Sequence, residues 1–385
     1  MCHGDRSLGV VATKPTYDRL VPEGADPLII GAPMSLTGRY ATMGRLAAAG
    51  LRQMAEDAAH AGGVLVSGKR RVPEVVIVDD ASTRSGVRRA LGLLAQADLL
   101  VGPYGSDLVA AAGAWGLARG RLIWNHGGSA DDVQRLRSVI SVSSPASVYL
   151  RTVLEAVAQR IPGATVIVAI GRGAFGRAAA EGAVEAGRRF GADDVSVLRH
   201  HEVPDEPDVD IVLAAGSFAD DIALVERLRR RPPVLAAVGA GVGGFDAAGD
   251  VEGVLAPSQW EEAVRFQVDT GPRSADVLRS LRARMIPFLT AGRSSSHIDY
   301  PVAQAYAAGL IALRCVEEVG VVDDGALADA ARRLRCTTFF GRFGLGPDGC
   351  QVDHAMVVSQ WRHGSRWLVW PPSLADAGAE IDARS

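Results

Sequence analysis

The chain is nearly without lysine: Lys14 and Lys69 are its only two, and arginine supplies the rest of the basic charge. Lys14 falls in an irregular N-terminal stretch and Lys69 in a Lys-Arg-Arg turn, so neither indicates lysine-based chemistry. Net charge is also small, at −3 over 385 residues. A protein that binds phosphate backbones needs a basic excess, so nucleic acid is not an expected partner.

Cysteine and long apolar runs are scarce as well. The four cysteines, Cys2, Cys315, Cys336 and Cys350, lack C-x-x-C pairs and metal-ligand spacing, so we expect unpaired thiols and no metal. A Cys336–Cys350 pair across a hairpin is the alternative. No apolar run reaches the ~18 residues of a membrane helix, so no direct membrane insertion is expected. The N-terminal residues lack a basic stretch followed by an apolar one and do not form a signal peptide as they stand.

From residue 28 onward, apolar strand patterns alternate with amphipathic helix patterns. In the first half we expect strands at 27–33, 74–80, 98–103, 121–125 and 139–143, with helices around 42–60, 85–96 and 107–119. After 143–147 the plan repeats, with strands at 164–171, 194–200, 210–216, 233–239 and 252–257 and helices at 177–190 and 219–231. Such alternation is typical of parallel sheets with helices on both faces. The predicted fold class is α/β, with two doubly wound parallel-sheet lobes.

In the stretch VGPYGSD, two glycines and a proline stand where a predicted strand ends and a predicted helix begins. Gly102, Pro103 and Gly105 allow a sharp turn and a close approach to a ligand, and Ser106 adds a hydroxyl to the free N–H groups of the helix start. Ligands bind outside the carboxyl ends of strands in doubly wound sheets, so this edge is a candidate site. The alternative is that Ser106 only caps its helix.

Two G-x-G-x-x-G matches support a competing hypothesis, an NAD(P)-dependent enzyme. They are Gly171, Gly173 and Gly176, and Gly239, Gly241 and Gly244. The dinucleotide fingerprint also needs an acidic residue at the end of the next strand. That strand ends in Arg199-His200-His201, while Asp193 and Asp194 stand at its other end. We therefore expect no nucleotide cofactor.

Other catalytic arrangements are sparse. His126 and Asp131 form a conceivable acid/base pair for an enzyme on this fold, although a loop histidine more often bonds to neighbouring backbone. His200 and His201 have no third ligand nearby, so a zinc site is not predicted.

Several stretches, in order along residues 28–372, resemble a known family. They are IGAPMSLTGRYATMGRLAAAGLRQMAED (30–57), VVIVDDAS (75–82), LLVGPYGSDLVAAA (99–112), RTVLEAVAQRIPGATVIVAIGRGAFGRAAAEG (151–182), IDYPVAQAYAAGLIAL (298–313) and TTFFGRFGLGPDGCQVDHAMVVSQW (337–361). Together they resemble the type I periplasmic-binding-protein fold, specifically the branched-chain amino acid (Leu/Ile/Val)-type substrate-binding proteins of ABC importers.

The resemblance implies two lobes joined by three crossovers, near 143–147, 257–263 and 351–355, that close on a ligand by hinge motion. The implied N-terminal lobe comprises 27–145 and 262–352, and the C-terminal lobe 146–261 and 353–372. Residues 1–26 form a polar arm and 373–385 a tail.

The resemblance also implies a site. Ser106 would hold the ligand carboxylate, Gly127, Gly128 and Ser129 would add donors, and Phe175 would cover the ligand. The remaining expected site residues are Tyr104, Gly105, Tyr40, Phe218 and Trp260; Tyr40 and Trp260 have ordinary packing as their alternative.

One departure from the family concerns the ligand. Amino-acid binders place an acidic residue after the strand at 233–239, where this chain has Gly239-Ala240-Gly241-Val242. Asp220 and Asp221 could substitute, but first-turn acids of a helix are common. We therefore expect a small carboxylate or an amide rather than an α-amino acid, bound without cofactor or catalysis.

The partner and the compartment depend on export. The resemblance implies an extracytoplasmic receptor that delivers its ligand to an ABC permease, with Cys2 typical of a lipoprotein whose signal has been removed. The alternative is a cytoplasmic ligand sensor of the same fold that acts through a regulatory partner protein.

Overall fold

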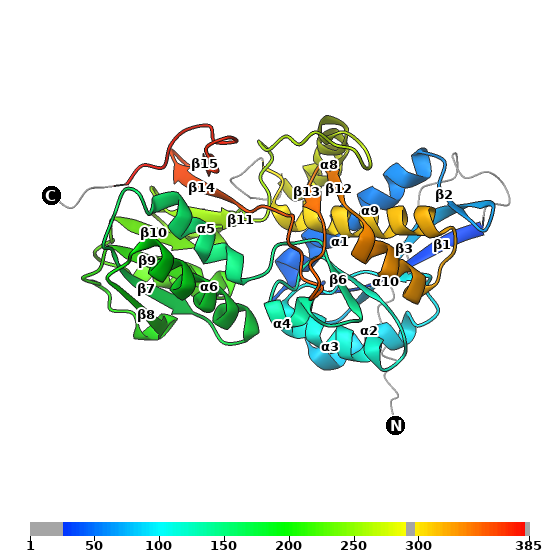
Figure 1. Ribbon diagram of the computed structural model, residues 1–385, viewed down its shortest axis with the longest axis horizontal. Coiled ribbons are helices and arrows are strands. Elements are labelled where there is room, and N and C mark those ends of the chain that lie inside the picture. Colours follow the sequence, from blue (N-terminus) through cyan, green and yellow to red (C-terminus); the bar gives the residue numbers. More distant parts are fainter. Residues whose placement is uncertain (1–25, 290–296, 382–385) are drawn as a thin grey trace, which may run out of the picture.

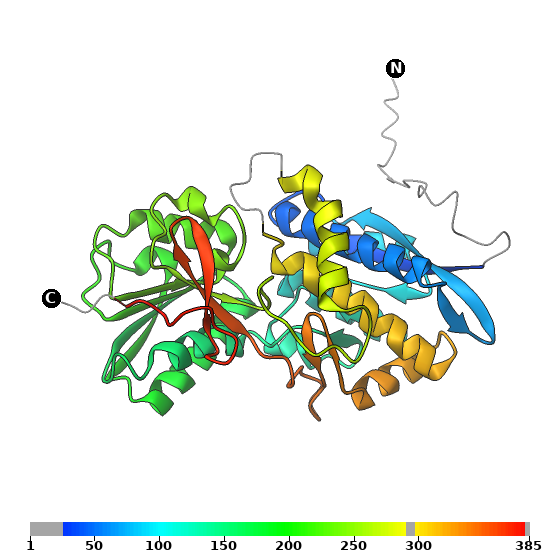
Figure 2. The ribbon, with the colours of Figure 1, turned by 90° about the horizontal axis from the view of Figure 1, so that it is seen from above.

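Two main sheets organise the residues that this computed structural model describes, 26–289 and 297–381 (Figure 1). One sheet has the strand order β2-β3-β1-β4, and the other has the order β15-β14-β11-β10-β9-β7-β8. Each sheet lies at the centre of one lobe, and Figure 2 shows the two lobes side by side.

The first lobe combines the N-terminal part of the chain with a later helical part. Its elements are β1 (Asp26–Met34), α1 (Ala41–His60), β2 (Val64–Val66), β3 (Lys69–Asp79), α2 (Arg84–Leu93), β4 (Leu99–Leu100), α3 (Ser106–Leu117), β5 (Ile123–Asn125), α4 (Asp131–Gln134), β6 (Val139–Ser141), α8 (Ser274–Leu289), α9 (Tyr300–Val319), α10 (Asp324–Arg333), β12 (Cys336–Thr338) and β13 (Gly341–Phe343).

The second lobe is built from the middle of the chain and its C-terminal hairpin. Its elements are α5 (Ser147–Val157), β7 (Thr165–Ile170), α6 (Ala174–Phe190), β8 (Asp194–Arg199), the 3₁₀ helix η1 (His200–Glu202), β9 (Ile211–Ala215), α7 (Phe218–Arg227), β10 (Val234–Ala237), the 3₁₀ helices η2 (Val238–Gly241) and η3 (Phe245–Ala248), β11 (Leu255–Ser258), β14 (Val357–Arg362) and β15 (Ser365–Trp370).

In the seven-stranded sheet, the strands that are covered on both faces are apolar along their buried length, and β7 shows why. Along β7, Val166 and Val168 pack on one face with α5 and α6, whereas Ile167 and Ala169 pack on the other face with α7. A parallel strand covered on both faces has no position for a polar side chain. The predicted doubly wound α/β class is thereby confirmed.

The structure differs from the sequence prediction at the sheet edges. β2 pairs antiparallel with β3, and the β14–β15 hairpin adds antiparallel strands beside β11. The strand predicted at 98–103 is reduced to Leu99–Leu100, because Gly102 and Pro103 lead the chain out of the sheet. The helix predicted at 85–96 ends at Leu93.

The chain passes between the lobes after β6, after β11 and after β13, and these three segments meet in a buried hydrogen-bonded cluster. Ser144 donates its amide to Gln259 Oε1 (2.9 Å), and Gln259 Nε2 donates to the Ser144 carbonyl (3.1 Å). Ser144 Oγ lies 2.8 Å from His354 Nδ1. One residue of each crossing segment is thus tied to the same point, while the exact lobe boundaries stay predictions.

Two further sequence predictions concern the described residues. Cys315, Cys336 and Cys350 are free, buried thiols, and Cys2 lies outside the described residues. Cys336 and Cys350 form no disulfide with each other. In the β12–β13 hairpin the residue opposite Cys336 is Phe343. Within the described ranges, no helix has the length and apolar character needed to cross a membrane.

Candidate ligand-binding site

A cavity of about 1000 Å³ lies between the lobes and is lined by both of them. From the first lobe come Tyr40, Tyr104, Gly105, Ser106, Gly127 and Ser129. From the second lobe come Phe175 and Phe218, together with the strand-end residues Gly171 and Gly216. These positions follow β1, β4, β5, β7 and β9, so the cavity sits outside the carboxyl ends of parallel strands from both lobes.

Ser106 is the first residue of α3, but it does not cap that helix. The N-cap is Gly105, whose φ of 99° is a conformation that favours glycine, and no described side chain caps the helix start. A Cβ on Gly105 would stand 2.7 Å from the Tyr40 ring. Ser106 Oγ instead accepts a hydrogen bond from the Ala130 amide (3.0 Å). The uncapped start of α3 therefore faces the cavity.

In the loop after β5, which was expected to add donors, the amides of both glycines already have a hydrogen-bond acceptor. Asn125 Oδ1 accepts the amides of Gly127 (3.0 Å) and Gly128 (2.8 Å). Gly128 is buried against Val109 and lies outside the cavity lining. Asn125 was missed from the sequence, although its position at the end of a predicted strand was the available signal.

Hydroxyl groups from both lobes lie beside these first-lobe residues. Tyr104 Oη lies 3.4 Å from Tyr300 Oη, and Ser129 Oγ lies 3.4 Å from Tyr149 Oη. Burial raises the pKa of Tyr104, Tyr149 and Tyr300, so all three remain neutral hydroxyls that can donate a hydrogen bond. Tyr149 and Tyr300 were missed from the sequence.

Aromatic rings surround these hydroxyls. Tyr40 and Tyr104 meet edge to face at 5.8 Å between centroids, and Tyr149 meets Phe175 in the same way at 5.3 Å. Burial, followed by the charge of Asp107, raises the pKa of Tyr40 to about 12. Such rings suit a ligand with an apolar body and a polar end.

A family model described as periplasmic binding protein matches residues 27–366. This chain belongs to the periplasmic binding protein family. The resemblance inferred from the sequence is thereby confirmed, and many solved structures share the fold. No curated protein sequence matches the chain.

Three solved structures illustrate the similarity of this periplasmic binding protein to solute-binding proteins. A leucine binding protein from Thermotoga maritima is 15% identical, with a TM-score of 0.73 over 89% of this chain and 97% of that one. A solute binding protein from R. palustris in complex with benzoate is 18% identical, with a TM-score of 0.70 over 93% and 100%. A branched-chain amino acid transporter substrate binding protein from Streptococcus pneumoniae in complex with isoleucine is 15% identical, with a TM-score of 0.69 over 89% and 98%.

In this periplasmic binding protein the two aspartates considered as ammonium partners are already engaged. Asp221 is fully buried and accepts hydrogen bonds from the amides of Gly216 (2.9 Å) and Gly239 (2.8 Å). Asp220 forms a capping box with Ser217 at the start of α7. Asp220 lines the cavity, whereas Asp221 does not.

Asp221 also holds His200, a residue considered from the sequence only as an incomplete zinc ligand. His200 Nε2 lies 2.8 Å from Asp221 Oδ1. Burial alone would lower the pKa of His200, but the hydrogen bond and charge of Asp221 outweigh it and raise that pKa above its usual value. Gly216 makes room for the ring, because a Cβ there would stand 2.6 Å from His200 Cε1. The described residues contain no cluster of three metal-ligating side chains.

The glycines of the first dinucleotide-like motif border the same cavity. Gly171 and Gly176 line it, and Arg199 occupies the end of β8, where the fingerprint needs an acid. Arg199 Nη1 donates to the Gly171 carbonyl (3.0 Å). The second motif forms η2 and the turn that follows it, and the Gly239 amide is bonded to Asp221.

Trp260 and His126 have structural surroundings rather than the roles considered for them. Trp260 is buried outside the cavity lining, with Nε1 donating to the Phe339 carbonyl (3.2 Å) and its ring against Phe339. His126 is fully buried, and Asp131 accepts from Ser147 instead (2.7 Å to its Oγ). The structure therefore does not bring His126 and Asp131 together as a pair.

Proposed function

We propose that this periplasmic binding protein is the substrate-binding component of an ABC importer and closes its lobes, without chemical change, on a small molecule that carries a carboxylate. The observation that carries the proposal is the cavity shared by the lobes, whose first-lobe wall offers neutral hydrogen-bond donors around the uncapped start of α3. A carboxylate is stabilised by such donors and by a helix N-terminus.

The surroundings of Asp221 favour a carboxylic acid over an α-amino acid. Its two oxygens already accept two backbone amides and face His200, so it is not available to a ligand ammonium group. The aromatic rings of Tyr149 and Phe175 fit an apolar ligand body. A structural neighbour from R. palustris is described in complex with 4-hydroxybenzoate, which combines these two features.

A thermal-shift screen tests the proposal. Purified protein is heated with aliphatic and aromatic carboxylates, amides, α-amino acids and nicotinamide nucleotides, since any ligand of the folded state raises the melting temperature. We expect shifts with carboxylates, recovery of the ligand unchanged by mass spectrometry, and weaker binding by Tyr149→Phe. Tyr306→Phe is the matched control, because its hydroxyl donates to Asp57 (2.8 Å) outside the cavity. A shift confined to nucleotides, or turnover of the ligand, would contradict the proposal.

A further inference from the structure

The charges that line the cavity are distributed unequally between its walls. On the first-lobe wall the only lining cation among the described residues is Arg39, and its guanidinium is paired with Asp107 at 2.5 Å. This wall is therefore close to neutral, and its polar groups are hydroxyls and amides. A ligand carboxylate on this side meets donors but no free cation from the described part of the chain.

The second-lobe wall carries two arginines without acidic partners in the described ranges. Arg172 follows β7 and Arg199 ends β8, so the side chains come from neighbouring strands of the sheet. Neither guanidinium forms an ion pair with any residue that the structure describes, and the Gly171 carbonyl that Arg199 bonds to is uncharged. Both arginines are exposed at the cavity, where a ligand can reach them.

His200 also lines this wall. Its Nε2 faces Asp221, which favours the protonated ring and balances its charge. Asp220, the one carboxylate in the lining as the structure describes it, accepts from Ser217 (2.7 Å to Oγ) and interacts with His200. One carboxylate thus stands against two arginines, because the buried Asp221 balances the charge of His200.

The second-lobe wall also contains the N-terminus of α6. The helix begins at Ala174 after Gly173, no described side chain caps it, and Phe175 and Gly176 line the cavity. A helix N-terminus carries partial positive charge. The helix start therefore adds to the positive charge that the arginines bring to this wall.

We infer that the ligand carries a second anionic group at the end that faces Arg172 and Arg199, and so is a small dicarboxylic acid with an apolar centre. This inference rests on the proposed function, since it assigns the first carboxylate to the wall at Ser106. The two anionic ends meet opposite walls, and the rings of Tyr149 and Phe175 contact the centre. A cationic end at the second lobe would meet like charge.

A series of probes that differ at one end tests the inference. Binding of terephthalate, 4-methylbenzoate and 4-(aminomethyl)benzoate is measured by calorimetry; they share a carboxylate and a ring, and their second ends are anionic, neutral and cationic. We expect terephthalate to bind about tenfold or more tighter than 4-methylbenzoate, since hydrogen bonds between charged groups are the stronger ones. The cationic probe should bind most weakly.

Substitutions test whether Arg172 and Arg199 cause the preference for terephthalate. Arg172→Gln combined with Arg199→Gln should reduce the preference for terephthalate over 4-methylbenzoate to within about twofold. Arg188→Gln removes the same charge from the exposed, distant end of α6 and should leave all affinities unchanged. Equal binding of the three probes, or a preference for the cationic one, would overturn the inference while the proposed function stands. If no carboxylate binds at millimolar concentration, the proposed function fails and the inference fails with it.

Discussion

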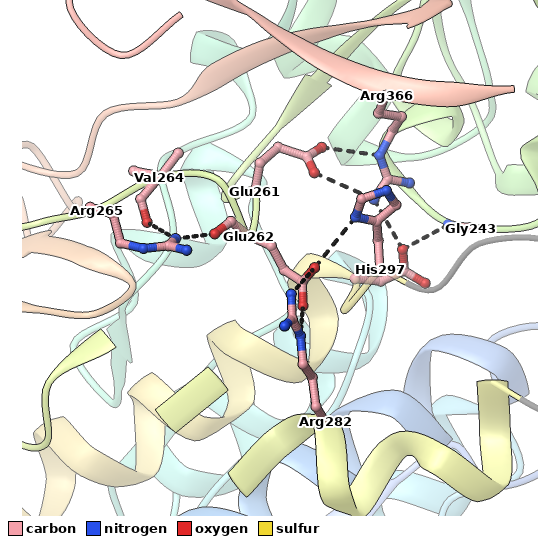
Figure 3. Close-up of polar contacts among 9 residues, drawn as sticks. Gly243, Glu261, Glu262, Val264, Arg265, Arg282, His297 and Arg366 are labelled. Atoms are coloured by element: carbon pink, nitrogen blue, oxygen red, sulfur yellow. Dashed lines mark hydrogen bonds and ion pairs between the residues drawn. The ribbon is translucent and has the colours of Figure 1, made fainter. Parts of the chain in front are cut away.

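Arg366 Nη2 lies 3.3 Å from Asp299 Oδ1, and this buried ion pair joins the two lobes. Arg366 belongs to β15 in the second lobe, and Asp299 precedes α9 in the first. Arg366 Nε also lies 3.2 Å from Oε1 of Glu261, which follows β11 in a crossing segment (Figure 3). The side chains of Arg366, Asp299 and Glu261 are 3%, 4% and 8% exposed, so the charges are almost removed from water.

Replacing Arg366 by Met should strongly destabilise the protein. The variant removes the positive charge of Arg366 from beside two buried carboxylates, Asp299 and Glu261. Removing one partner of a buried ion pair costs about 3–5 kcal/mol. We expect a loss of this size in the free energy of unfolding, measured by urea denaturation.

Arg332→Met is the matched control for this experiment. Arg332 pairs with Asp329 three residues earlier on the surface of α10, with side chains 43% and 67% exposed. An exposed pair contributes less than about 1 kcal/mol. Similar losses in the two variants would show that the buried cluster does not tie the lobes together.

Gly50 and Gly92 should respond oppositely to alanine. Gly50 lies where α1 crosses α9, and a Cβ there would stand 2.0 Å from the Val302 carbonyl, so Gly50→Ala should lower the unfolding free energy by about 1–3 kcal/mol. Gly92 is exposed in α2 with open space around it, so Gly92→Ala should raise the unfolding free energy by about 0.5–1 kcal/mol. Thermal and urea melts of both variants measure this, and a destabilised Gly92→Ala would contradict the helix packing described.

The fold could be predicted from the sequence because local patterns determine it. Buried parallel strands need continuous apolar runs, such as the one ending at Ile170, which is followed by Gly171 and then by α6. Carboxyl ends of parallel strands gather at one edge, which is why the strand and helix pattern places Tyr104 and Ser106 at a candidate site. The position of Phe175 opposite them, in the second lobe, was implied by the family resemblance. The antiparallel edge strands were missed, since edge pairing depends on the neighbouring strand rather than on local pattern.

The rest of the cavity could not be predicted, because it depends on distant segments. Tyr300 begins α9, nearly two hundred residues after Tyr104, yet their hydroxyls lie 3.4 Å apart. Tyr149 comes from the second lobe and reaches Ser129 of the first. Trp260 was expected at the cavity from the family resemblance, with ordinary packing as the alternative. Its ring packs against Phe339 instead of the cavity. No pattern in the sequence distinguishes these placements.

Phe175→Ala and Trp260→Phe should separate ligand affinity from stability. Phe175 lines the cavity beside Tyr149, so its loss should weaken binding of the tightest carboxylate about tenfold or more. Trp260→Phe removes the donor to the Phe339 carbonyl and should cost about 1–3 kcal/mol of stability, with the dissociation constant unchanged. Calorimetry and urea melts measure the two quantities. If Trp260→Phe weakened binding as much as Phe175→Ala, Trp260 would belong to the binding site after all.

His126 should make the protein sensitive to mild acid. Its side chain is fully buried, both ring nitrogens lack partners among the described residues, and burial lowers its pKa to about 3. The unfolded chain, with a histidine pKa of about 6.5, binds a proton that the folded chain excludes. Stability is therefore complete above pH about 6.5 and falls as the pH drops toward 3, by about 1.4 kcal/mol per unit at most.

His126→Phe should remove this loss. The ring keeps a similar shape beside Tyr104, and no hydrogen bond of the imidazole to a described residue is given up, so the variant should be at least as stable as the parent at pH 7.5. At pH 4.5 it should be more stable than the parent by about 2–3 kcal/mol. His354, whose pKa burial lowers to about 4, remains in both proteins, so part of the acid sensitivity persists. Urea melts across this range measure the difference, and parallel pH profiles for the two proteins would show that His126 is protonated, or hydrated, in the folded state.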